Sequence, residues 1–126
     1  MAHNDLVLKA RELGKGNVLA FDCPSRQILQ HVTSRWGTLI LIALSDGTLR
    51  FSELRRRVDG ISERMLAQTL QVFESDRLVV RRAHDVVPPH VDYTLTPLGA
   101  EVASRVLTLA CWIEDNLADL LAATPA

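Results

Sequence analysis

The sequence predicts a mainly α (α+β) domain of the winged helix-turn-helix type, and three observations lead to that prediction. Two helical segments lie on either side of a tight turn at Asp59-Gly60. Residues 78–96 then change from helical to alternating apolar periodicity, which is typical of a β-hairpin. A long helix with a heptad-like apolar seam follows from Pro97 to about Ala122. The 126 residues are enough for one such domain with a core of its own.

Two helices are expected ahead of the motif. The first runs from Pro24 to about Ser34, because proline is favoured at the first position of a helix. The second spans Trp36–Leu44, which is apolar on nearly all sides, as in a central buried helix. Residues 6–13 are compatible with a further short helix.

The helix-turn-helix itself is expected from Phe51 to about Asp76. Its first helix covers residues 51–58, and Gly60 supplies the left-handed cap that follows. Ser62 is a favoured N-cap for the second helix, which in this motif enters the major groove of DNA. The side chains expected to be buried along this second helix are Met65, Leu66, Thr69, Leu70 and Phe73.

The hairpin is expected to form a two-stranded wing, from Leu78–His84 and Val91–Thr96. Pro88-Pro89 stiffens the long loop between the strands. Thr96-Pro97 then repeats the cap-and-proline signal that starts a helix. The order of the elements, with a hairpin directly after the two helices, is what distinguishes this pattern from a bare helix-turn-helix.

Charge is unevenly distributed along the chain, although the formal net charge is only −1. Residues 48–84 hold eight arginines and five acidic residues, whereas residues 97–126 hold Arg105 against four acidic residues. DNA binding depends on the distribution of charge more than on its sum, so the basic middle permits it. Chance clustering on a solvated surface is the alternative interpretation.

Residues of the second helix can contact base edges, because arginine pairs with guanine and glutamine with adenine. The residues expected to contact bases are Ser62, Arg64, Gln68 and Gln71. The residues expected to contact the phosphate backbone, directly or from the wing, are Arg50, Arg55, Arg56, Arg82, His84 and His90. One or more of the arginines at 55–57 is expected to pair with Glu53 or Asp59. An ordinary polar helix face, and exposed loop polarity for the two histidines, are the alternatives.

A homodimer is expected because one such helix contacts only a few base pairs. Two of them must lie about one DNA turn, ~34 Å, apart. The residues assigned to the dimer interface along the last helix are Val102, Val106, Leu109, Ile113, Leu117 and Leu120. Packing of this helix on its own domain alone is the alternative. Trp36 and Trp112 are candidates to line a pocket for a small hydrophobic effector, with simple core packing as the alternative.

Several strings resemble the HxlR family of bacterial regulators over roughly residues 23–112. They are Cys23-Pro24, Trp36-Gly37, Arg50-Phe51-Ser52-Glu53-Leu54-Arg55, Gly60-Ile61-Ser62-Glu63-Arg64-Met65-Leu66, Val87-Pro88-Pro89-His90-Val91-Asp92-Tyr93-Thr94-Leu95-Thr96 and Leu98-Gly99. The resemblance implies a dimeric winged helix related to the MarR regulators, near-palindromic operators and frequent repression of nearby genes. Position 77 is arginine where the family commonly has glycine, so the turn there must form without glycine.

The two cysteines do not suggest a structural disulfide, because the chain shows no secretion signal. Cys23 occupies an apparent helix N-cap, where the helix dipole favours a thiolate. The resemblance points the same way, since several members respond to thiol-reactive electrophiles or oxidants through a cysteine near the N-terminus. An inert cap is the alternative for Cys23. Cys111 is expected to pack in the core or the dimer interface.

The sequence therefore predicts a homodimeric regulator that binds double-stranded DNA, with a redox or electrophile response through Cys23. A winged-helix module that binds proteins, and a small-molecule-sensing regulator without a cysteine role, remain alternatives. An enzyme is not expected, because no glycine-rich phosphate loop or catalytic triad pattern occurs.

No cofactor is expected, and no metal either, because the histidines and cysteines show no paired ligand spacing. The longest apolar run, Leu39–Leu44, is far below the ~18 residues of a membrane span, so a cytoplasmic protein is expected. The domain boundaries expected are an extension at 1–22, the winged domain at 23–122 and a tail at 123–126.

Overall fold

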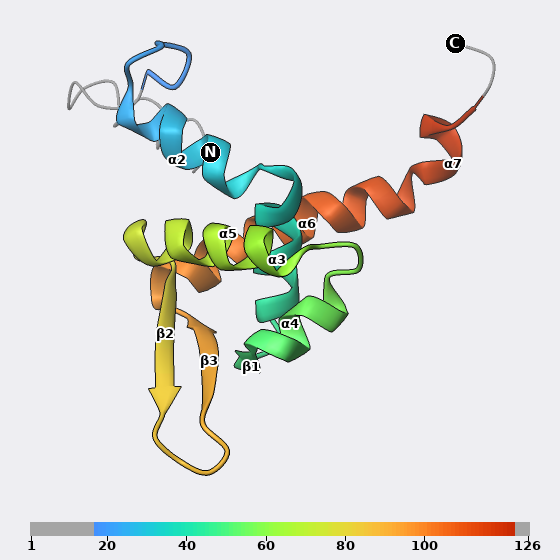
Figure 1. Ribbon diagram of the computed structural model, residues 1–126. Helices are drawn as coiled ribbons and strands as arrows, with labels where there is room; N and C mark the ends of the chain where they lie inside the picture. The colour runs from blue at the N-terminus through green and yellow to red at the C-terminus, as the bar shows by residue number, and fades with distance from the viewer. Residues whose placement is uncertain (1–16, 123–126) are drawn as a thin grey trace.

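The computed structural model describes residues 17–122, in which α5 lies above the β2–β3 hairpin and α4 lies beside β1 (Figure 1). The helices are α2 (Pro24–Val32), α3 (Arg35–Leu44), α4 (Phe51–Arg57), α5 (Glu63–Ser75), α6 (Pro97–Asp115) and α7 (Leu117–Leu120). The strands are β1 (Leu49–Arg50), β2 (Val79–His84) and β3 (His90–Leu95). This order confirms the winged helix-turn-helix that the sequence predicts. The short helix considered at residues 6–13 lies outside the described residues.

Local signals explain where the helices of the motif begin. The Ser62 hydroxyl caps α5 by accepting a hydrogen bond from the Met65 amide at 3.1 Å, and Thr96 caps α6 through the Gly99 amide at 3.0 Å. Such caps satisfy amide groups that have no partner inside the helix. Gly60 has the left-handed φ of 88° expected for the turn between α4 and α5.

The sheet has three strands, in the order β1-β3-β2, rather than the two that the sequence predicts. Leu49 and Arg50 pair antiparallel with Tyr93 and Asp92 on the outer edge of β3. A strand of two residues is too short to produce a periodic pattern, so only the pairing reveals it. The pairing ties the start of α4 to the wing.

The core lies between α3, α4, α5, the first half of α6 and the inner face of the sheet. Its largest fully buried side chains are Phe73, Ile40, Leu41, Leu44, Leu54, Leu66 and Leu70. Met65, expected to be buried, is 38% exposed, and Thr69 is only half-buried. The buried stripe of α5 centres on Leu66, Leu70 and Phe73, and Met65 lies roughly a quarter-turn away from that centre.

Arg77 forms the turn after α5 with a left-handed φ of 62°. The Leu78 amide donates to the Phe73 carbonyl at 2.9 Å and the Arg77 amide to the Glu74 carbonyl at 3.0 Å, which is the pattern of a Schellman cap. The expectation that this turn forms without glycine is confirmed. Packing of Phe73 and Leu78 on either side holds arginine in a conformation that glycine would adopt more easily.

The last helix is interrupted, whereas the seam predicts one helix to about residue 122. Asn116, with φ −112° and ψ 13°, separates α6 from α7. Its side-chain amide donates to the Trp112 carbonyl at 2.8 Å and so satisfies an acceptor at the end of α6. Within residues 17–122, no helix is long and apolar enough to span a membrane.

Candidate DNA-binding surface

Helix α5 presents a polar face to solvent. Arg64, Gln68 and Gln71 are all exposed, and small Ala67 lies between them. At about 100° per residue, Arg64 and Gln68 lie opposite the buried stripe of Leu66, Leu70 and Phe73. Ser62 is exposed at the N-terminal end of α5, where its oxygen caps the helix and its hydroxyl hydrogen stays available to donate. The three helical residues expected to contact bases thus share one exposed face of α5, and Ser62 is exposed at the N-cap of the helix.

The arginines of α4 differ in what they can offer to a phosphate. Arg55 pairs with Glu63 at 2.8 Å and Arg57 with Asp46 at 2.7 Å. The prediction that these arginines pair with Glu53 or Asp59 is wrong. The turn between α4 and α5 brings Glu63 beside Arg55 instead. Arg56 is exposed and makes no ion pair within residues 17–122.

The main-chain amide of Arg50 has a structural role. Its amide donates to the Glu53 carboxylate at 2.8 Å, at the N-cap of α4. Arg50 is opposite Asp92, and Asp92 is opposite Arg82 on the next strand. Residues opposite one another share a face of a sheet, so Arg50 and Arg82 flank Asp92 on one face. Both arginine side chains are exposed.

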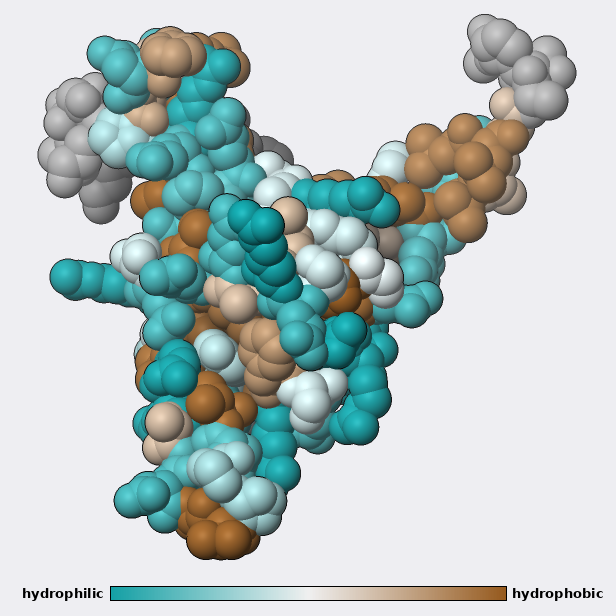
Figure 2. Space-filling model, in the orientation of Figure 1, coloured by the Kyte–Doolittle hydropathy of each residue, from teal (hydrophilic) through white to brown (hydrophobic). Residues whose placement is uncertain are grey.

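The wing carries its arginines along β2 rather than at its tip. The tip is apolar (Figure 2), with Val86 52% and Val87 99% exposed. His84 and His90 flank the loop, and their rings stack with centroids 4.6 Å apart. His84 Nε2 is 2.6 Å from Asp92 Oδ2. The alternative interpretation of both histidines as plain exposed loop residues does not hold, because both are half-buried and in contact with each other.

The C-terminal arm, here the half of α6 after Val106 together with α7, projects away from the domain (Figure 1). Its exposed apolar surface (Figure 2) includes Leu109, Trp112, Ile113, Leu117 and Leu120. Two residues expected at a dimer interface instead pack within the chain. Val106 is buried in the core, and Val102 packs against that core. Cys111, expected in the core or the dimer interface, is exposed on the arm of the single chain and so lies outside the core.

Cys23 is the N-cap of α2, as expected, and is half-buried. Its Sγ is 2.8 Å from the Ser25 hydroxyl, and it makes no side-chain cap of the helix. Beside it, the Arg26 guanidinium lies 5.7 Å from the centre of the Phe21 ring. Phe21, Cys23 and Arg26 line an open pocket of about 400 Å³.

Neither tryptophan lines the pocket beside Cys23 or the pocket between α3 and α6. Trp36 stacks with the Arg35 guanidinium at 4.6 Å, and Trp112 is 54% exposed on the arm. This second pocket, of about 420 Å³, lies between α3, the end of α4 and α6, and is lined by apolar Leu39, Ile42 and Leu107 together with charged Asp46, Arg57 and Asp59.

Residues 31–120 match the model of the HxlR-like helix-turn-helix family. The chain is 58% identical over 113 residues to YtfH of Escherichia coli K12, described as an HTH-type transcriptional regulator of uncharacterised function; the match covers 90% of each chain.

Two solved structures extend the comparison. The putative transcriptional regulator YtfH from Salmonella typhimurium is 59% identical, with a TM-score of 0.81 over 85% of this chain and 96% of that one. The redox regulator HypR in its reduced form is 34% identical, with a TM-score of 0.70 over 77% and 96% of the two chains. The family match, the fold and the exposed polar face of α5 therefore all point to a helix-turn-helix regulator that binds DNA.

Proposed function

The chain belongs to the HxlR-like helix-turn-helix family and is a DNA-binding regulator of transcription, and from that premise we propose that it represses genes as a homodimer on near-palindromic operators. One observation carries the proposal. The face of α5 opposite the core ends in side chains that can hydrogen-bond to base edges, and none of Arg64, Gln68 and Gln71 has a partner in an ion pair or side-chain hydrogen bond within residues 17–122.

The division of roles follows from position on this surface. Arg64 and Gln68, near the start of α5, contact bases, because the N-terminal half of a recognition helix meets the base edges. Arg56 and Arg82 contact phosphates, since both are exposed and carry no ion pair in the described part of the chain. Arg55 contacts phosphate only after its bond to Glu63 opens.

The homodimer is supported by the C-terminal arm. Side chains such as Leu109 and Leu120 are 54% and 53% exposed in one chain, and apolar groups on a projecting helix gain stability when a second copy covers them. Closed twofold association would set two α5 helices about one DNA turn apart, at ~34 Å.

The test is binding to duplex DNA selected from a random pool and to unselected duplex, over a salt series. Arg64→Ala is expected to lose about 1–3 kcal/mol on the selected site and little on unselected DNA. Arg56→Ala is expected to weaken both and to lower the salt slope by about one. Arg105→Ala, an exposed arginine on α6, is the matched control and is expected to change neither.

Absence of salt-dependent binding to any duplex would contradict the proposal and favour a module that binds proteins. Equal losses for Arg64→Ala and Arg105→Ala would contradict the assignment of α5 as the recognition helix. Footprinting on the promoters next to the gene, followed by transcription in vitro, distinguishes repression from activation.

A thiol signal forms the second part of the proposal: oxidation or alkylation of Cys23 weakens operator binding. Cys23 lies at the N-terminus of α2, where the helix dipole stabilises a thiolate, and the structural relative HypR is described as a redox regulator. A larger or charged group on Sγ would displace Ser25 and the start of α2.

Diamide or quinone treatment followed by titration with operator DNA tests this part. Wild type and Cys111→Ser are expected to lose affinity, and Cys23→Ser is expected to retain it. An equal loss of operator affinity in Cys23→Ser would exclude Cys23 as the site of the thiol response. A response to an apolar ligand that needs neither cysteine would instead support an effector site, such as the pocket beside Leu107.

A further inference from the structure

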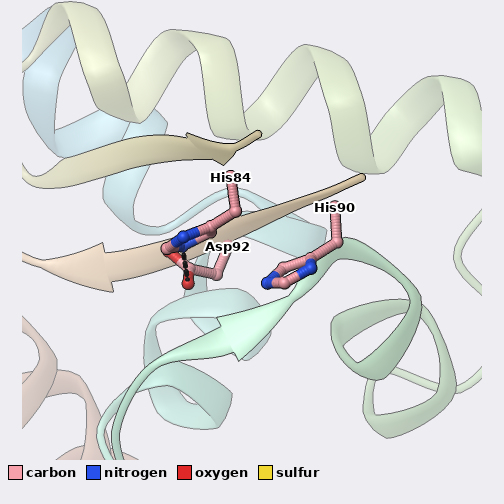
Figure 3. A group of neighbouring side chains, drawn as sticks. All are labelled: His84, His90 and Asp92. Carbon is pink, nitrogen blue, oxygen red and sulfur yellow. Dashed lines mark hydrogen bonds and ion pairs between the residues drawn. The ribbon is translucent and has the colours of Figure 1, made fainter. Parts of the chain in front are cut away.

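His84, His90 and Asp92 form a compact cluster at the outer end of the wing (Figure 3). His84 ends β2, and the other two lie at the start of β3. One ligand atom from each side chain, a ring nitrogen or a carboxylate oxygen, lies within 4.8 Å of the others. All three side chains are half-buried rather than extended into solvent.

Strand pairing explains the cluster. His84 and His90 are directly opposite one another, a position that places two Cβ atoms about 4.5–5.5 Å apart. Asp92 follows His90 by two residues and therefore lies on the same face of the sheet. The chain spacing of 84, 90 and 92 resembles no metal motif, and the hairpin alone brings these ligands together.

The carboxylate of Asp92 is incompletely satisfied. Its Oδ2 is bonded to His84 Nε2 at 2.6 Å, whereas its Oδ1 is buried and has no hydrogen-bond partner. A buried acceptor without a partner is costly. The His90 ring stacks on His84 and directs a nitrogen toward the other two side chains (Figure 3).

We propose that His84, His90 and Asp92 bind one divalent transition-metal ion, with Zn²⁺ as the best fit. Two imidazole nitrogens and one carboxylate oxygen are ligands that Zn²⁺ accepts, and a fourth, open position would hold water. Tetrahedral coordination separates ligand atoms by about 3.3 Å, given metal–ligand distances near 2.0–2.1 Å. On binding, the metal would take the place of the hydrogen between His84 Nε2 and Asp92 Oδ2, and the single ring proton of the neutral imidazole would lie on Nδ1.

The ion would act on the wing in two ways. It would join β2 to β3 at the base of the exposed 85–89 loop and so restrict the motion of the tip. It would also neutralise Asp92, which otherwise places a negative charge between Arg50 and Arg82 on one face of the sheet. This consequence for DNA rests on the proposed function, whereas metal binding itself does not.

The experiment titrates untagged, EDTA-treated full-length protein with Zn²⁺ by calorimetry, and with Co²⁺ by absorption. Wild type is expected to bind one equivalent per chain. His84→Gln, His90→Gln and Asp92→Asn are each expected to weaken binding about tenfold or more. The remaining two histidines of the chain provide matched controls, and His3→Gln and His31→Gln are expected to keep wild-type affinity.

Circular dichroism checks that each variant is folded, and Zn²⁺ is expected to raise the Tm of wild type but not of His90→Gln. No saturable binding to wild type, or equal loss in His31→Gln, would overturn the metal site. Affinity for duplex DNA with and without Zn²⁺ separates the two proposals. Zinc binding that needs His84 and His90, in a chain that binds no DNA, would support the metal site and contradict the proposed function.

Discussion

Apolar side chains are buried in the winged core and exposed on the C-terminal arm. In the core, Phe73, Leu66 and Leu70 are essentially inaccessible to solvent. On the arm, Trp112 of α6 and Leu117 of α7 are 54% and 45% exposed, although the first half of α6 is packed in the core. The change occurs after Val106, where α6 passes beyond the domain.

The contrast shows that one helix can serve two purposes. Its first half completes a core that one chain builds by itself, through Ala103 and Val106. Its second half presents apolar surface that gains nothing until another surface covers it. We therefore expect truncation in the core to affect unfolding of the single chain, and changes on the arm to affect association.

The largest expected effect comes from truncating aromatic side chains in the two regions. Phe73→Ala is expected to lower the free energy of unfolding by about 3–5 kcal/mol, because the fully buried ring leaves a cavity. Trp112→Ala is expected to cost far less in dilute protein, since half of that side chain is already exposed. Urea unfolding at several protein concentrations measures both. Equal losses in the free energy of unfolding for the two variants in dilute protein would contradict the distinction between core and arm.

A charge on the arm is expected to break the dimer without unfolding the domain. Ile113→Asp should convert dimer to monomer and lower operator affinity by about two orders of magnitude, because a carboxylate would be buried between chains. Ser104→Asp places the same charge on the opposite side of α6, nine residues away, and is expected to leave the dimer intact. Sedimentation equilibrium gives the answer, and a monomeric wild type would refute the arm as an interface.

The smallest expected effect concerns the turn after α5. Arg77→Gly is expected to stabilise the domain by about 1 kcal/mol or less, because glycine adopts the left-handed φ of 62° without strain. Ser75→Gly, two residues earlier in helical backbone, is expected to destabilise by about 0.5–1 kcal/mol. Thermal and urea unfolding of the two variants should differ in sign. The same sign for both would show that Arg77 makes contacts that offset its backbone strain.

Much of the candidate surface could be predicted because it depends on local rules. The exposure of Arg64, Gln68 and Gln71 follows from the helical repeat once the buried stripe is recognised. The ion pair of Arg55 could not be predicted in this way, because its partner Glu63 is eight residues away on another helix. Met65 shows the limit of the pattern itself, since its exposure depends on how far α5 rotates against α3.

By itself, the sequence determined the order of elements, the caps at Ser62 and Thr96 and the left-handed turn at Gly60. These depend on helical and strand periodicity and on bonds between residues a few positions apart. Only the tertiary structure decided that β1 extends the sheet and that His84, His90 and Asp92 meet. Those contacts join residues by strand register and by the packing of separate elements, which no short-range pattern specifies.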